Sequence, residues 1–253
     1  MHSERELRAR QSDHADPLVT LLSEARLKRC RQLAAGNAER AVRLHQADAE
    51  LAASLYGMLR AFEIGLRNSI DHRLREHLQT PDWILAPPPG LIWKDSERRV
   101  IADATKRASR SGAEIETLRV RHDRMVSSLN FGFWCHLFKR AYEHVLWKSA
   151  LERLFPNRAI RGQEVFERLD ALRDVRNRVA HHDAVLPHRA RGARETVGWL
   201  LHEMTPIAGS TRSRELFSAM LSPHLERVAR REAEYGIILN EITPAVPAGD
   251  RRG

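Results

Sequence analysis

Apolar residues recur at helical spacing along most of the chain, and the longest such stripe lies in its first third. No proline interrupts residues 37–78. The stretch therefore predicts one long helix of an antiparallel bundle, with Gly57 and Gly65 as points where it could break. Its stripe consists of Leu55, Leu59, Phe62, Leu66, Ile70 and Leu74.

Similar stripes predict shorter helices at 18–33, 96–110, 117–128, 131–154, 195–204, 212–221 and 224–239. Proline and glycine predict a loop at 79–93, held by Trp83 and Trp93, and the arginine-rich stretch 188–194 also reads as a loop. Alternating strand patterns and internal repeats are absent. The sequence thus predicts an all-α fold: a single domain at 17–242 between disordered segments at 1–16 and 243–253.

A further apolar stripe lies in residues 161–183, where a helix is expected to face the core. Arg176 falls in the middle of this stripe. A buried guanidinium needs a carboxylate, a phosphate or water beside it, so Arg176 is a candidate functional residue. The apolar members of the stripe are Val165, Leu169, Leu172, Val175 and Val179.

Polar residues follow Arg176 at the end of the same predicted helix. Asn177 and His181 are four residues apart and lie on one side of it. Arg176 and His181 diverge by about 140° on an ideal helix, so one regular helix does not direct both at one atom. Either an irregular helix end or a second copy of the helix across a two-fold axis would remove this difficulty.

Glu63 is a second charge within an apolar stripe, in the long early helix. It has two candidate partners. Arg176 could meet it across the bundle in a charge-assisted pair, or Arg67 could pair with it one turn along the same helix.

Composition limits the classes of protein that the chain can represent. Its 253 residues include 42 Lys and Arg against 33 Asp and Glu, a net charge of +9. This excess favours a polyanionic partner, although a high-GC genome that replaces Lys with Arg would account for it as well. Two distant cysteines, no signal sequence and no 18-residue apolar run favour a cytoplasmic protein without a membrane span.

The spacing of Arg176, Asn177 and His181 recurs in the early helix as Arg67, Asn68 and His72. About 0.2 occurrences are expected by chance in a chain of this composition. The later copy is preferred as the functional one, because only its arginine lies within an apolar stripe.

The later motif, RNRVAH, resembles the R-polar-x3-H motif of HEPN ribonucleases, and RNRVAHH resembles its form in the Abi-like, abortive-infection branch. Two further segments are similar to that branch: AFEIGLRNSI at 61–70 and SSLNFGFWCHLF at 127–138. The resemblance covers roughly residues 18–186. It implies a HEPN-like helical bundle with additional helices. For the aromatic residues at 131–134, core packing is expected over base stacking.

The resemblance also implies a metal-independent endoribonuclease of an abortive-infection or toxin–antitoxin system, which attacks phosphorus through the ribose 2′-OH and leaves 2′,3′-cyclic phosphate ends. His181 would act as general acid or base, Arg176 would stabilise charge on the phosphoryl oxygens, and Asn177 would orient the histidine or a phosphate oxygen. Glu63 and His182 would support them. No metal and no cofactor are expected.

RNA is the expected substrate, with a homodimer and an RNA or protein antitoxin as partners. The competing interpretation is a non-catalytic RNA-binding or protein-interaction module, since a fold does not fix a function. A DNA-binding bundle is a weaker alternative, and no zinc, P-loop or dinucleotide motif is present. The arginines expected to contact RNA are Arg173, Arg178, Arg189, Arg191 and Arg194.

Overall fold

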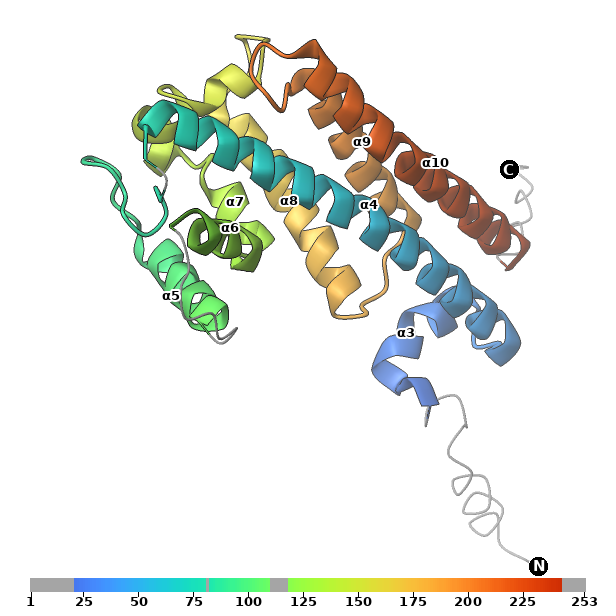
Figure 1. Ribbon diagram of the computed structural model, residues 1–253. Helices are drawn as coiled ribbons and strands as arrows, with labels where there is room; N and C mark the ends of the chain where they lie inside the picture. The colour runs from blue at the N-terminus through green and yellow to red at the C-terminus, as the bar shows by residue number, and fades with distance from the viewer. Residues whose placement is uncertain (1–20, 81, 110–117, 243–253) are drawn as a thin grey trace, which may run out of the picture.

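The computed structural model describes residues 21–80, 82–109 and 118–242. Of these residues 77% are helical and none lies in a strand, which confirms the predicted all-α class. The segments predicted to be disordered, 1–16 and 243–253, lie outside the described residues. The helices pack around one long central helix, α4 (Figure 1).

Helix α4 (Ala38–Leu78) is unbroken, so the breaks anticipated at Gly57 and Gly65 are absent. Asn37 begins it by accepting a hydrogen bond from the Arg40 amide at 2.9 Å. The two glycines serve close packing instead. A Cβ on Gly65 would lie 2.0 Å from the ring of Phe217 in α10 (Thr211–Ile242), which runs beside α4.

Helix α10 is continuous, whereas the sequence predicted two helices separated at Pro223. Proline removes one backbone donor, which leaves a carbonyl of the preceding turn without its helical partner. Pro223 and Ala219 are both exposed, so water can satisfy that carbonyl. The opposite face is held against α4 by buried side chains that include Phe217 and Tyr235.

Helix α9 (Pro187–Glu203) includes residues 188–194, which were predicted to be a loop. Pro187 stands in the first turn, where its fixed φ favours helix and its missing N–H costs nothing. The arginines and alanines that follow are good helix formers, and Ala190 and Ala193 are buried. The loop prediction is wrong because Pro187 begins this helix and the buried alanines hold its inner face, while the arginines face outward.

The single helix predicted at 131–154 is also wrong. The chain forms α7 (Phe131–His136), a 3-10 turn (Arg140–Tyr142), a π-helical turn (Glu143–Trp147) and a second 3-10 turn (Leu151–Leu154). At about 100° per residue, the buried side chains would point all around one straight helix. The breaks allow all of them to reach the core. They are Trp134, Leu137, Phe138, Tyr142, Leu146, Trp147, Ala150, Leu151 and Leu154.

Three further helices lie close to their predicted positions: α5 (Asp95–Ser109), α6 (Leu118–Ser128) and α8 (Gly162–Ala180). Helix α3 (Glu24–Leu33) ends as predicted but begins after Ser23, whose φ of 64° interrupts the helix, and residues 18–20 of the predicted helix lie outside the described residues. Helix α8 packs against α4, α7 and α9, and its five apolar stripe residues are buried as predicted.

Two predictions about buried aromatic residues are confirmed. Trp83 and Trp93 are buried and hold the loop between α4 and α5. The Trp83 indole N–H donates to Asp71 of α4 at 2.8 Å. The aromatic residues of α7 are also buried, so they pack in the core and are not available for base stacking: Phe131, Phe133 and Trp134.

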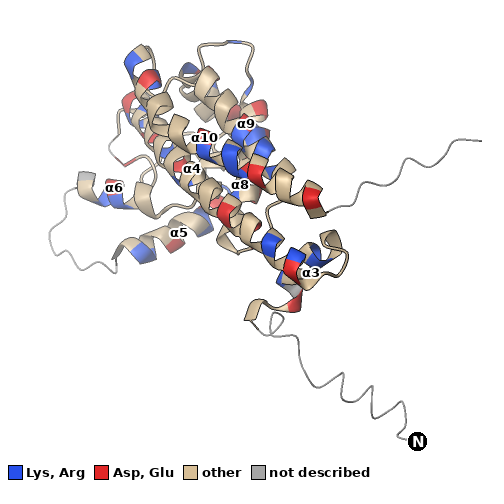
Figure 2. Cartoon of the chain, turned by 90° about the vertical axis from the view of Figure 1, so that its right-hand side faces the viewer, with Lys and Arg blue, Asp and Glu red and all other residues tan. Residues whose placement is uncertain are grey.

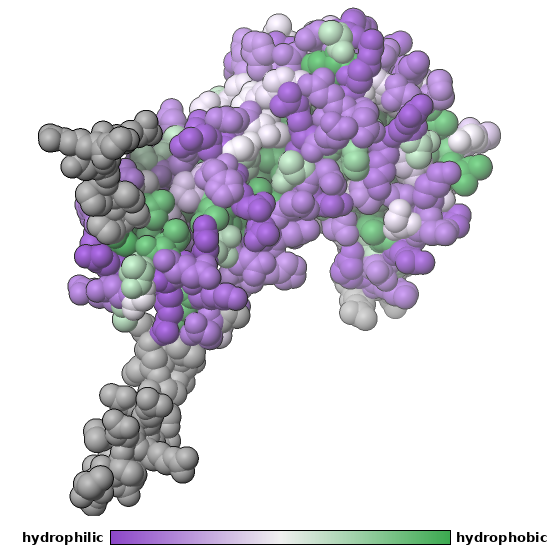
Figure 3. Space-filling view, turned by 180° about the vertical axis from the view of Figure 1, so that it is seen from behind, coloured by the Kyte–Doolittle hydropathy of each residue, from purple (hydrophilic) through white to green (hydrophobic). Residues whose placement is uncertain are grey.

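The surface is polar and mixed in charge. Basic and acidic residues alternate along the helices and do not form separate faces (Figure 2). Seen from behind, the molecule is mostly hydrophilic, with small apolar patches (Figure 3). No helix in the described ranges has the length and hydrophobicity to cross a membrane. Cys30 and Cys135 are both free and buried.

Candidate functional site

The chain turns sharply where α8 ends. His181 is the C-cap residue, and His182 adopts a left-handed φ of 56°. The His182 amide donates to the Val179 carbonyl, and the Asp183 amide donates to the Arg178 carbonyl at 2.9 Å. This is a Schellman ending with histidine in the position that usually holds glycine. It makes the helix end irregular and leaves His181 exposed.

An open pocket of about 390 Å³ lies at this helix end. It combines an imidazole, an amide, two guanidinium groups and two carboxylates. Two of the three predicted catalytic residues and two of the five predicted RNA-binding arginines are therefore brought together. The lining residues are Asp174, Asn177, Arg178, His181, Asp183 and Arg189.

Arg176 is not among the residues that line this pocket. Its Nε lies 3.9 Å from Glu63 Oε2, with Arg176 38% exposed and Glu63 17% exposed. Burial raises the pKa of the Glu63 carboxyl, while the charges of Arg176 and Arg67 oppose that rise. Both predicted partners of Glu63 are therefore close enough to influence it. Within one chain, Arg176 and His181 lie on different sides of α8, as their divergence on an ideal helix suggested.

The other predicted RNA-binding arginines are engaged elsewhere. Arg191 and Arg194 form ion pairs with Glu232 of α10, at 2.5 and 3.4 Å. Arg173 pairs with Asp170 at 3.0 Å and lies 3.3 Å from Nε2 of His136. These three side chains connect helices, so Arg178 and Arg189 are the arginines that the structure places beside His181.

Asp48 anchors the segment that leaves α8, a role that the sequence analysis did not assign. Its Oδ1 accepts the amide hydrogen of Val185 at 2.9 Å. Burial raises the pKa of this carboxyl to about 6, although the hydrogen bond from Val185 favours its ionised form. The sequence pattern could have indicated this role, because Asp48 falls at helical spacing between Leu44 and Leu51, which are both buried on the same face of α4.

His122 of α6 is fully buried between two carboxylates. Its Nε2 lies 2.6 Å from Asp71 Oδ1, and its Nδ1 lies 3.3 Å from Asp82 Oδ1. Burial alone would lower the pKa of His122, but its hydrogen bonds and charge interactions with both aspartates raise it. Because the ring is inaccessible, this group joins α4, α6 and the tryptophan loop and does not bind substrate.

His136 of α7 forms a second histidine–carboxylate pair, with Nδ1 2.7 Å from Glu97 Oε1. Tyr142 donates to the other Glu97 oxygen at 3.0 Å. Burial lowers the pKa of His136, and Arg173 faces its Nε2. With both ring nitrogens engaged, the imidazole connects α5, α7 and α8 and is not a free base.

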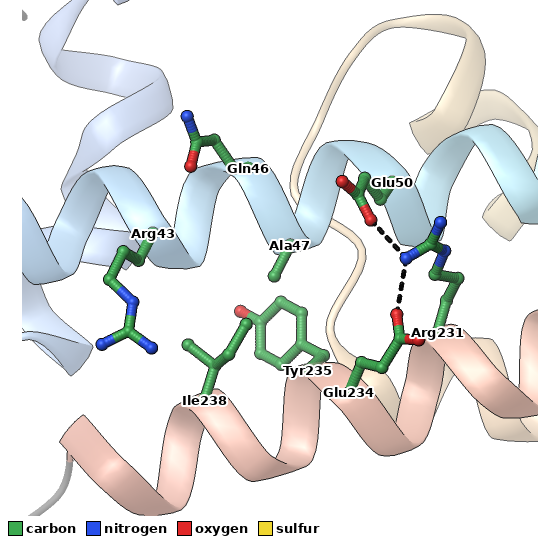
Figure 4. A pocket seen from close by; sticks show the side chains of 8 residues that line it. All are labelled: Arg43, Gln46, Ala47, Glu50, Arg231, Glu234, Tyr235 and Ile238. Carbon is green, nitrogen blue, oxygen red and sulfur yellow. Dashed lines mark hydrogen bonds and ion pairs between the residues drawn. The ribbon is translucent and has the colours of Figure 1, made fainter.

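A third polar site, of about 160 Å³, lies between α4 and α10 (Figure 4). The ring of Tyr235 and the side chain of Ile238 form part of its wall. Arg231 bridges Glu50 and Glu234, each at 2.6 Å. Arg231 thus joins a carboxylate of α4 to one of α10, so the site is a helix–helix contact.

Among the described residues, no three His, Cys, Asp or Glu side chains are grouped so as to hold a metal ion. The pocket at the end of α8 remains the one that gathers most of the residues singled out by the sequence motif. Comparison of the chain with protein-family models, curated proteins and solved structures finds no match.

Proposed function

We propose that this protein is a metal-independent endoribonuclease of the HEPN type, acting in an abortive-infection or toxin–antitoxin system. The observation that carries the proposal is the shared pocket of Asn177, His181, Arg178 and Arg189. Cleavage of RNA without a metal needs a group that moves protons and cations that stabilise phosphoryl charge. The pocket supplies an imidazole for the first and guanidinium groups for the second.

The reaction forms a bond between the ribose 2′-oxygen and phosphorus and breaks the bond from phosphorus to the 5′-oxygen. His181 takes the proton of the 2′-OH, and a second acid protonates the departing 5′-oxygen. Arg178 and Arg189 neutralise the phosphoryl oxygens, while Asn177 orients the phosphate or the imidazole. The products are a 2′,3′-cyclic phosphate and a 5′-hydroxyl.

A homodimer would supply the groups that one chain lacks. Arg176 faces Glu63 and does not line the His181 pocket. An isologous dimer through α8 would face the two helix ends across a two-fold axis. The second copy would then offer its Arg176 as a cation and its His181 as the acid.

Alanine substitutions at the two motif copies test this assignment. His181→Ala should lower cleavage of single-stranded RNA by about 10²-fold or more, because it removes the acid–base group. His72→Ala, in the early copy, is the matched control and should cleave like the natural protein. Loss of cleavage in the His72 variant together with full cleavage in the His181 variant would mean that the early copy carries the reaction and the later copy does not.

The second candidate is a non-catalytic RNA-binding or protein-interaction module. The carboxylates of Asp174 and Asp183 in the pocket weaken its attraction for phosphate, which favours the protein-interaction form of this alternative. RNA that is bound equally by the natural protein and by His181→Ala, and cut by neither, would select this alternative.

A further inference from the structure

The arginines of the two motif copies both lie near one carboxylate. Arg67 stands one helical turn from Glu63 on α4, and the Nε of Arg176 in α8 lies 3.9 Å from Glu63 Oε2. The charges of both arginines act on the Glu63 carboxyl. From the sequence, only one of the two copies is expected to be functional, whereas the fold places both arginines on the same side of α4. Arg67 therefore belongs to the same cationic cluster as Arg176.

This cluster carries more positive charge than its carboxylate compensates. Two guanidinium groups share Glu63, and the Arg176–Glu63 distance of 3.9 Å exceeds that of a hydrogen bond. The Nε of Arg67 is buried and has no hydrogen-bond partner within the described part of the chain. Since each guanidinium has five N–H donors, donors remain available to an additional anion.

A cavity gives an anion access to Arg67. It measures about 290 Å³, between α4 and α6, and is also lined by Asn68 and Ser127. The two carboxylates at its wall already have cationic neighbours. Asp71 lies 3.7 Å from Arg75, and Asp123 lies 3.9 Å from the same guanidinium group. Val126 completes the lining.

We propose that Arg67 and Arg176 form a phosphate-binding subsite, in which Glu63 holds the two guanidinium groups until a phosphodiester replaces it as their partner. Paired guanidinium groups match the oxygens of a phosphate in charge and geometry. The inference rests on the proposed function in taking that phosphate to belong to RNA. It makes Arg67 a substrate-binding residue.

Binding of RNA that cannot be cleaved separates this subsite from catalysis. A fluorescent 2′-O-methyl RNA lacks the 2′-OH nucleophile, and its affinity is read by fluorescence anisotropy. Arg67→Ala and Arg176→Ala should each weaken binding about tenfold, as expected for a charge-assisted contact. Each should also reduce the slope of log affinity against log salt by about 0.7. Arg60→Ala, two turns earlier on the exposed face of α4, is the matched control.

Glu63→Gln distinguishes a competing anion from a structural support. It should tighten binding roughly threefold, because the carboxylate no longer competes with phosphate. Arg67→Ala binding like Arg60→Ala, or Glu63→Gln weakening binding as much as Arg176→Ala, would overturn the subsite. Circular dichroism confirms that each variant is folded. Arg67-dependent binding of the analogue, with no cleavage of ordinary RNA, would refute the proposed reaction and leave the subsite standing.

Discussion

At the scale of single residues, the end of α8 combines exposed chemistry with backbone strain. His182 holds a φ of 56°, which costs a residue with a side chain about 1 kcal/mol. Strain of this kind persists where surrounding contacts fix the chain. Two hydrogen bonds of the helix ending and the Asp48–Val185 bond provide those contacts. The position of His181 thus depends on residues outside the motif.

Asp48 gives this anchor a pH dependence. The pKa of its carboxyl is raised to about 6 in the folded protein, against an ordinary value of 3.8. The folded state therefore favours the protonated form, and the associated stability, present near pH 4, is lost as pH rises through 6. Two pKa units correspond to about 3 kcal/mol.

Asp48→Asn should remove the loss of folding stability at high pH, because the amide oxygen still accepts the Val185 N–H and carries no charge. Thermal unfolding should show the variant matching the natural protein near pH 4 and exceeding it in melting temperature at pH 8. A variant less stable than the natural protein at pH 8 would mean that the charge itself supports the anchor.

At the scale of helices, hydrophobic periodicity located most helices but not all of the residues at which they begin and end. The pattern of α4 and α8 was sufficient, because each buries one stripe. It failed at Pro223, where packing on α4 keeps the helix intact, and at 188–194, where charged residues conceal a helix. The pairing of Glu63 with Arg176 was foreseeable as one of two alternatives. The approach of both arginines to Glu63 was not, since the place of Arg176 depends on how α4 and α8 cross.

Gly65 tests the tight contact between α4 and α10. Gly65→Ala should destabilise the protein by about 1–3 kcal/mol, because the new methyl group would overlap the Phe217 ring. Gly236→Ala in α10 is the matched control. Its Cβ would meet nothing within 4 Å, so the variant should gain up to about 1 kcal/mol from helix propensity. Equal urea midpoints for the two variants would contradict the packing.

At the scale of the whole molecule, the proposed dimer explains why Arg176 and His181 occupy different surfaces. A chain carrying His181→Ala mixed with a chain carrying Arg176→Ala should regain part of the cleavage, because the heterodimer keeps one His181 as base and one Arg176 as cation and lacks the second His181 as acid. The separate variants should be inactive. Full activity of the natural protein at concentrations where light scattering finds only monomer would exclude the shared site.

The central claim is cleavage of RNA without a metal at the end of α8. Its most direct test incubates the protein with total RNA in EDTA and identifies the ends of any fragments. Cleavage should be unaffected by the chelator and should leave 2′,3′-cyclic phosphate and 5′-hydroxyl ends, and the His181→Ala variant should not cleave. Cleavage that stops in EDTA and returns with a divalent metal, or fragments with 5′-phosphate ends, would contradict it.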